Sequence, residues 1–299
     1  MSGAPEQRAS WRNWRAWRIE QLDRRVIFLL MFLAVLLPLL RPVGLPIVPT
    51  RKVIGLYDAI EGLPEGSVVY FAADWDPGGA AELMPMAEAA LRHLFRRKMK
   101  VIAATTWPTA GPLTANALRK VADEEFHLTY GVDYVDLGFK EGREIAMVSI
   151  ATDIANAYPV DARGTPTASL PLMQRVKSFH DVAILLSVSA GYPGTKEWLQ
   201  QVQGRWQLKT ASLTTAVSEP EFVPNYQSGQ LVGLVGGLAG AAEYETLIGV
   251  PGAATKGMDA QSLGHLVIIA LIVVSNAVYL AKRGKAREAK REQNRGGSS

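Results

Sequence analysis

The stretch that decides the fold runs from residue 67 to residue 106 and reads SVVYFAADWDPGGAAELMPMAEAALRHLFRRKMKVIAATT. Its two ends, 67–73 and 100–106, are short runs rich in the β-branched and aromatic residues that favour strands. Between them, residues 80–97 repeat apolar side chains at the i, i+3, i+4 and i+7 spacing of an amphipathic helix. A strand, a helix and a second strand in this order predict a βαβ unit with parallel strands.

The same alternation continues along the chain. Further strands are predicted at 134–138, 181–189 and 210–217, and further helices at 113–126, 143–158, 172–179 and 195–203. Right-handed crossovers between parallel strands place helices on both faces of one sheet. We therefore expect an α/β domain of the Rossmann-like, doubly wound kind, a three-layer sandwich with about five mainly parallel strands. The order of the strands does not follow from the sequence.

Charge is unevenly distributed along the 299 residues. Residues 50–264 contain 18 Lys/Arg and 23 Asp/Glu, a net charge of −5, whereas the two ends contain 14 and 5, a net charge of +9. The basic pI therefore belongs to the ends, and we expect no nucleic-acid binding by the central part. The chain has no Cys, which excludes disulfides, thiolate metal sites and Cys nucleophiles.

Two apolar stretches flank the central part. Residues 265–281, HLVIIALIVVSNAVYLA, run into a basic tail and predict a second transmembrane helix. The first span is predicted at 26–48, with an apolar core VIFLLMFLAVLLPLL and a Pro-rich exit. A cleavable signal peptide is the alternative for this first stretch. The long leader before it and the lack of an A-x-A site after it favour an uncleaved anchor.

Six Arg precede the first span and seven Lys/Arg follow the second, which places both termini in the cytoplasm by the positive-inside rule. We expect a bacterial inner membrane and the following order: a cytoplasmic segment 1–25, the first span 26–48, an extracytoplasmic domain 50–226, a glycine-rich helix 227–248, the second span 265–281 and a cytoplasmic tail 282–299. In the first segment the Trp and Arg side chains recur every three residues and predict a helix at the lipid interface: Trp11, Trp14, Trp17, Arg12, Arg15 and Arg18. A disordered basic leader is the alternative.

Candidate ligand-binding residues follow the predicted strands, because ligands of doubly wound sheets bind at the carboxyl ends of the strands. These residues are Asp74, Asp76, Thr105, Thr106, Ser187, Ser189 and Glu219.

Asp74-Trp-Asp76 after an apolar strand resembles the first motif of haloacid-dehalogenase-type phosphotransferases. The resemblance covers these few residues, and Pro77-Gly78 departs from the pattern that follows in the family. It implies a nucleophilic carboxylate, a second acid/base carboxylate and bound Mg²⁺, with Asp74, Asp76 and Thr105 as catalytic candidates. The alternative is that both carboxylates cap the turn Asp-Pro-Gly-Gly and neighbouring amides. Without that family's chemistry, we expect no cofactor.

Other catalytic motifs are missing from the sequence. The turn after residue 76 is neither G-x-G-x-x-G nor a P-loop, and no Ser lies in a G-x-S-x-G elbow. The four His show no zinc-binding spacing, and His93 is predicted to lie on the surface of its helix. We therefore expect no metal site from His.

The glycine-rich segment 227–248 predicts close helix packing. Gly229, Gly233 and Gly237 are four apart, as are Gly236 and Gly240, and on a helix they form a smooth face. This face predicts either contact between protomers or packing on the domain's own sheet, and a re-entrant or interfacial membrane contact is a further alternative. Asn276, a polar residue inside the second span, predicts a neighbouring helix in the membrane.

The sequence therefore predicts a binding or scaffold subunit in an oligomeric membrane assembly, with the lipid bilayer and either other copies or other membrane proteins as partners. The alternatives are a membrane-anchored, metal-dependent hydrolase or phosphotransferase and a small-molecule sensor domain.

Overall fold

The structure, a computed structural model, describes residues 24–296. It divides into two compact units. One unit is the domain Val43–Met258, and the other comprises the described parts of Met1–Pro42 and Asp259–Ser299. The interfacial Trp and Arg residues predicted in segment 1–25 lie outside the described residues.

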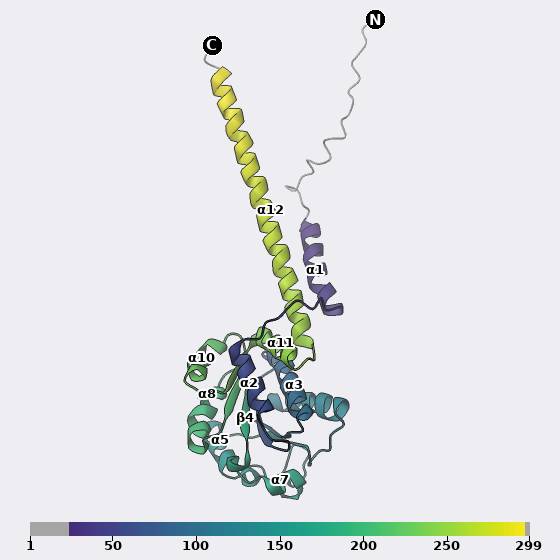
Figure 1. The fold of residues 1–299 in the computed structure, drawn as a ribbon, viewed down its shortest axis with the longest axis vertical. Helices are drawn as coiled ribbons and strands as arrows, with labels where there is room; N and C mark the ends of the chain where they lie inside the picture. Colours follow the sequence, from purple (N-terminus) through teal and green to yellow (C-terminus); the bar gives the residue numbers. More distant parts are fainter. Residues whose placement is uncertain (1–23, 297–299) are drawn as a thin grey trace. The chain divides into compact units, whose positions relative to one another are not determined.

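The domain contains one sheet of six parallel strands (Figure 1). The strands are β1 Val68–Asp74, β2 Lys100–Thr105, β3 Tyr134–Phe139, β4 Ile184–Ser189, β5 Thr210–Thr214 and β6 Gly233–Gly236. Their order is β3-β2-β1-β4-β5-β6, so the direction of winding changes between β1 and β4. The predicted α/β, Rossmann-like class is confirmed, with one more strand than expected.

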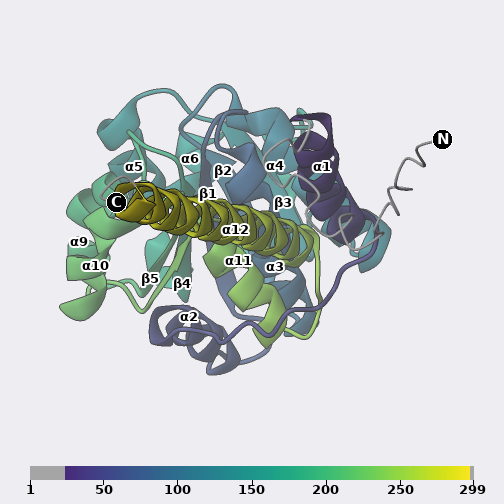
Figure 2. The same ribbon diagram turned by 90° about the horizontal axis from the view of Figure 1, so that it is seen from above.

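Two hydrophobic cores lie on opposite faces of the sheet, because successive side chains of a strand point to opposite sides. Val69, Phe71 and Ala73 of β1 contribute to the first core, and Tyr70 and Ala72 to the second. The first core includes side chains of α2 Arg51–Glu61, α3 Ala80–Arg96, α4 Ala110–Leu118, η3 Arg119–Glu125 and α11 Gly237–Leu247. Viewed from above, α3 and α11 lie on one side of the strands and α5 and α6 on the other (Figure 2).

The second core includes side chains of α5 Arg143–Thr152, α6 Ile154–Ala157, α7 Pro171–Arg175, η5 Phe179–Asp181, α8 Thr195–Trp198 and η6 Leu199–Gln203. The remaining short elements are η4 Thr167–Ser169, α9 Gly204–Trp206 and α10 Glu219–Gln227. The single helix predicted at 143–158 is broken at Asp153, whose side chain accepts a hydrogen bond from the Asn156 amide and begins a new helix.

The prediction of one glycine-rich helix at 227–248 is wrong for its first half. Gly233 and Gly236 lie on the edge strand β6, and Gly229 lies in a turn at a φ of 80°. Only Gly237 and Gly240 of this set belong to α11. The five glycines therefore form no common helix face.

Close packing inside the domain explains Gly233 and Gly236. A Cβ on Gly233 would lie 2.5 Å from the Leu56 amide nitrogen of α2, and one on Gly236 would lie 2.1 Å from the Glu219 carboxyl carbon. Helix α2 and Glu219 of α10 thereby pack closely on β6. These two glycines allow close packing inside the domain, but as part of the sheet and not on a helix packed against it.

The boundaries predicted for the domain also change. The helix α12 Ala253–Gly296 begins 12 residues before the predicted span at 265, and the compact domain continues to Met258 rather than ending at 226. Glu245 of α11 explains this early start. Its carboxylate is 1% exposed and accepts hydrogen bonds from the amides of Gly252, Ala254 and Thr255, at 2.8, 3.1 and 2.8 Å. These are amide groups that a helix N-terminus leaves without intrahelical partners.

The apolar stretches differ from each other in length. Among residues 24–296, one helical segment, Ala253–Leu280, is long and apolar enough to cross a membrane, and it contains the predicted span 265–281. The helix α1 Arg24–Leu40 has 17 residues and ends well before the predicted boundary at 48, because the chain after Arg41 is extended and rich in Pro. At about 1.5 Å per residue it covers roughly 26 Å.

Candidate functional site

The carboxyl ends of β1 and β4 form the position where doubly wound sheets bind their ligands. Asp74 is the last residue of β1 and is fully buried. Its Oδ1 accepts hydrogen bonds from the amide and the hydroxyl of Thr106, both at 2.7 Å. Its Oδ2 accepts one from Trp198 Nε1 at 2.9 Å. Both carboxylate oxygens therefore have protein partners.

Burial raises the pKa of Asp74 from 3.8 to about 6, and the hydrogen bonds from Thr106 and Trp198 oppose this rise. The nucleophile that the phosphotransferase resemblance implies would have to reach a phosphorus atom from solvent. A carboxylate that is fully buried and hydrogen-bonded through both oxygens does not fit that role.

Asp76 is half-buried and caps the turn that follows β1. Its Oδ1 accepts a hydrogen bond from the Gly79 amide at 3.1 Å. The alternative prediction, in which Asp76 caps the Asp-Pro-Gly-Gly turn, matches this geometry. Thr105 bonds locally too, because its Oγ1 accepts from the Trp107 amide at 2.9 Å. Mg²⁺ would therefore have to displace the protein partners of both Asp74 oxygens and of Asp76 Oδ1, so these residues do not fit the ion.

Backbone amides at this edge of the sheet are occupied by the protein's own carboxylates. In nucleotide-binding sheets, amides of this kind, at helix N-termini and glycine-rich turns, bind phosphate. Here Asp74 accepts from Thr106, Asp76 from Gly79, Glu82 from Ala216 and Glu197 from Gly194, at 2.7, 3.1, 2.8 and 2.8 Å. An anionic ligand would have to displace a carboxylate from each of these positions, so this edge disfavours phosphate.

Ser187 and Ser189 lie in a buried cluster of hydroxyl groups at the end of β4. Thr195 Oγ1 is its centre, at 3.0 Å from Ser187 Oγ, 3.0 Å from Ser189 Oγ and 2.9 Å from Ser212 Oγ. The Thr195 amide also donates to Ser189 Oγ at 3.2 Å. The cluster connects the start of α8 to β4 and β5, and each of its four hydroxyl residues is at most 1% exposed.

Trp107 crosses the end of β1. It follows β2, yet its Nε1 donates to the Pro193 carbonyl in the loop after β4 at 2.7 Å. A Cβ on Gly191 in that loop would lie 3.7 Å from the Trp107 ring. Because β1 lies between β2 and β4 in the sheet, this contact joins the loops on either side of β1.

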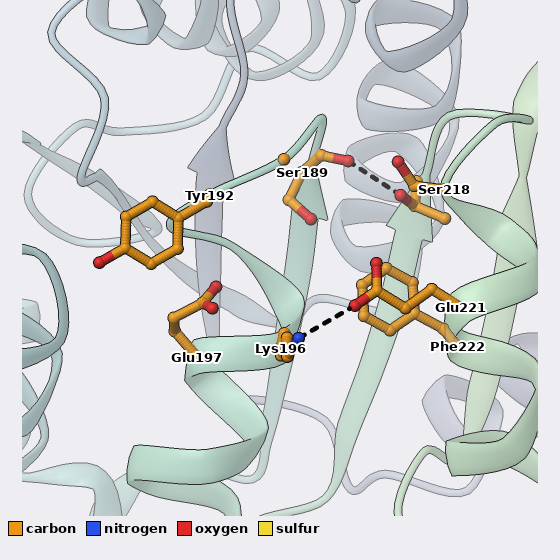
Figure 3. Close-up of a pocket in the computed structure, with 9 residues that line it drawn as sticks. Ser189, Tyr192, Lys196, Glu197, Ser218, Glu221 and Phe222 are labelled. Carbon is orange, nitrogen blue, oxygen red and sulfur yellow. Dashed lines mark hydrogen bonds and ion pairs between the residues drawn. The ribbon is translucent and has the colours of Figure 1, made fainter.

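One open space at this edge lies beside β4 and β5. A cavity of about 210 Å³, here called the β4–β5 cavity, is lined by residues of β4, β5, α8 and α10 (Figure 3). Of the predicted site residues it includes Ser189. The others that line it are Gly191, Tyr192, Lys196, Glu197, Thr214, Ser218, Glu221 and Phe222.

Glu219 does not line this cavity. It pairs with Lys52 of α2, and the acidic residue of α10 that lines the cavity is Glu221. Glu197 was also not predicted, although a Glu at the third helical position, which accepts from the Gly194 amide before it, is typical of a helix start. That pattern predicts local structure but not the cavity beside it.

His93, predicted on the surface, is buried between three helices. Its Nδ1 lies 2.6 Å from the Tyr244 hydroxyl and its Nε2 lies 3.0 Å from Glu61 Oε1, and its ring stacks on Tyr57 at 4.8 Å. Burial lowers the pKa of His93, while Glu61 acts in the opposite direction. The residue connects α3 with α2 and α11 and lies away from the strand ends.

Within residues 24–296, no group of three or more His, Asp or Glu side chains is placed to hold a metal ion. Comparison of the chain with models of protein families, with curated proteins and with solved structures found no match to any of them.

Proposed function

We propose that this chain is a two-span protein of a bacterial inner membrane and that its Rossmann-like domain is a binding or scaffold subunit of an oligomeric membrane assembly. Both termini lie in the cytoplasm under this proposal, and the domain lies on the other side. The observation that carries it is the apolar surface of α12. The basic tail follows this apolar segment directly in the sequence.

The side chains of α12 support a membrane environment. Large apolar residues of this helix are more than half exposed, among them Leu266, Ile269, Val273 and Leu280 at 61–62%. Monomeric soluble proteins rarely expose an apolar surface of this extent. Lipid would cover it.

The helix α1 supports a second span. Phe28 is 69% exposed and Leu40 is 73% exposed, although the helix is almost entirely apolar. A Cβ on Gly264 of α12 would lie 3.9 Å from both Met31 and Val35 of α1, which is ordinary packing distance. Two apolar helices in contact are what a two-span anchor requires.

The strand ends favour binding over catalysis. The carboxylates that would do phosphoryl chemistry hold backbone amides and an indole instead, as described for Asp74 and Asp76. These bonds stabilise the loops at this edge and leave a preformed surface.

Asn276 supports association in the membrane. It is exposed on α12 within an apolar stretch and makes no side-chain hydrogen bond to a described residue. A polar side chain in lipid gains a partner when helices associate, a contribution of about 1–2 kcal/mol in model peptides. A second copy of the chain supplies such a partner by symmetry.

Topology can be tested cleanly because the chain has no native Cys. Val217→Cys, at a position that is 89% exposed in the domain, and Ser299→Cys would each be treated with a membrane-impermeant maleimide in intact spheroplasts. We expect labelling at 217 and none at 299 until the membrane is permeabilised. Labelling at position 299 in intact spheroplasts would refute the proposed orientation.

Self-association can be tested by measuring mass in nanodiscs or mild detergent. Asn276→Val is expected to lower the fraction of oligomer, whereas Asn276→Gln, which keeps an amide, and Val274→Leu, on the same helix, leave it near the wild-type value. A wild-type protein that is monomeric at all concentrations would refute the oligomer.

A further inference from the structure

The β4–β5 cavity has the size of a small-molecule site. Its volume of about 210 Å³ corresponds to roughly seven water molecules at about 30 Å³ each. It is smaller than typical sites for drug-sized ligands, which occupy about 300–1,000 Å³. A second cavity of about 420 Å³ shares Lys196, Glu221 and Phe222 with it and extends along α10.

Glu197 is the charged group best placed to bind a ligand there. It is 6% exposed, and it lines the cavity. One carboxylate oxygen, Oε2, accepts from the Gly194 amide at 2.8 Å. The other, Oε1, accepts no hydrogen bond from a described residue. The carboxylate of a largely buried residue beside a cavity interacts strongly with a charged donor, because the low local dielectric strengthens the interaction.

The rest of the lining also suits a cation. Glu221 adds a second carboxylate. Its Oε1 lies 3.4 Å from Lys196 Nζ, and both side chains of this ion pair are more than half exposed. Such exposed pairs are weak, so an incoming ammonium can replace Lys196 at Glu221. Phe222 and Tyr192 supply aromatic rings, which attract cations to their faces (Figure 3). One face of the Tyr192 ring already has the Arg143 guanidinium over it, 5.4 Å from the ring centre, so the other face would meet the ligand.

Anions have no comparable place in this cavity. Of the neighbouring backbone amides, that of Gly194 already donates to Glu197 and that of Thr195 to Ser189. The lining has two carboxylates and one ammonium, which gives it a net negative charge.

We propose that the β4–β5 cavity binds a small organic ammonium ion, with Glu197 Oε1 accepting a hydrogen bond from the ammonium group, Glu221 as the second carboxylate, and Tyr192 and Phe222 on either side. This assignment does not depend on membrane topology or on self-association, so it can fail while the proposed function holds.

Ethanolamine is a suitable probe, and ethylene glycol, which has a hydroxyl in place of the ammonium, is its matched neutral control. Binding would be measured by calorimetry or by NMR line shifts on the full chain in phosphatidylglycerol nanodiscs. We expect saturable binding of ethanolamine and at least tenfold weaker binding of ethylene glycol. Equal binding of the two compounds, or no binding of ethanolamine, would overturn the proposal.

Glu197→Gln tests the residue without removing its structural role. The Gln carbonyl still accepts from the Gly194 amide, as Gln does in capping boxes. We expect the melting temperature to stay within a few degrees of wild type and ethanolamine affinity to fall at least tenfold. Glu65→Gln, an exposed residue paired with Lys98, is the control and keeps full affinity. Unchanged affinity in Glu197→Gln would overturn the assignment.

The same ammonium chemistry occurs on a lipid headgroup, and a second measurement separates the two sources. The affinity for ethanolamine would be measured again in nanodiscs that contain phosphatidylethanolamine. An unchanged affinity assigns the cavity to a free amine, whereas a lower affinity, caused by competition from the lipid, assigns it to the headgroup.

Discussion

Asp74 accepts a hydrogen bond from the indole of Trp198 at 2.9 Å, although 124 positions separate the two residues in the chain. The bond joins the end of β1 to α8 inside the second core, where the Trp198 ring also lies 5.6 Å from the Tyr70 ring and 6.0 Å from the Phe179 ring. The carboxylate thereby connects the sheet to the helix layer of the second core. Its ionisation is therefore expected to change the stability of the fold.

Stability is predicted to depend on pH through Asp74. Its pKa is raised to about 6 in the folded state, so the folded protein binds this proton more tightly than the unfolded chain does. The resulting stabilisation is complete below pH 4 and is lost as the pH rises through 6. A shift of about two pKa units corresponds to about 3 kcal/mol. Asp136, whose pKa burial also raises to about 6, acts in the same direction.

Asp74→Asn isolates this contribution, because Asn resembles the protonated carboxyl group and does not titrate. Between pH 4 and pH 7 the wild type is expected to lose about 3 kcal/mol of its free energy of unfolding through this group, whereas the variant does not. The difference, variant minus wild type, therefore becomes more positive by that amount. Denaturant unfolding followed by Trp fluorescence would measure it. A difference that stays constant with pH would contradict the prediction.

Trp198→Phe extends the same test. The indole hydrogen bond lowers the pKa of Asp74 against the effect of burial. Its removal is expected to move the pH midpoint of the stability change upward, and it leaves one buried carboxylate oxygen without a partner at a cost of about 1–3 kcal/mol. A midpoint below that of wild type would show that the bond does not favour the charged form.

Glu245→Gln is predicted to weaken the start of α12. The carboxylate accepts from three amides and from the Thr255 hydroxyl at 2.6 Å, whereas Gln has a single acceptor oxygen and adds two donors that find no acceptor there. We expect a loss of about 1–3 kcal/mol in the free energy of unfolding of the domain. Glu65→Gln, with a side chain that is 61% exposed, is the control and should change stability by less than about 0.5 kcal/mol. Equal effects of the two changes would contradict the capping role.

The sequence was most informative where local pattern and tertiary structure agree. The stretch 67–106 predicted β1, α3 and β2 to within about one residue, because each element is long enough to show its own period and ends at a turn. The rule that ligands bind at strand ends also placed Asp74, Ser187 and Ser189 at one edge. The helix α2 was missed because it follows directly on the Pro-rich chain of the first anchor.

Contacts distant in sequence could not be predicted. Nothing local to Asp74 indicates that Trp198 is its partner. The cavity lining comes from two strands, two helices and the loops between them, which the sheet order brings together. The strand β6 was missed because it has four residues, two of them glycine, and glycine spacing is compatible with either a helix face or a covered strand.

The last prediction concerns Gly233, whose two proposed roles give opposite results. A Cβ there would lie 2.5–2.6 Å from the backbone and Cβ of Leu56, which cannot move without shifting α2. Gly233→Ala is therefore expected to destabilise the isolated protomer by about 1–3 kcal/mol, as overpacking does. Gly204→Ala is the control, since a Cβ there meets nothing within 4 Å, and it should be neutral or stabilising by up to about 1 kcal/mol.

Thermal unfolding at a protein concentration too low for self-association would measure both variants. If Gly233 packed only between protomers, the protomer of Gly233→Ala would melt at the wild-type temperature and only the oligomer would weaken. A lower melting temperature at every concentration would instead assign the glycine to the contact between β6 and α2. Loss of an oligomer in Gly233→Leu would then report damage to the domain, so the membrane contact has to be tested at Asn276.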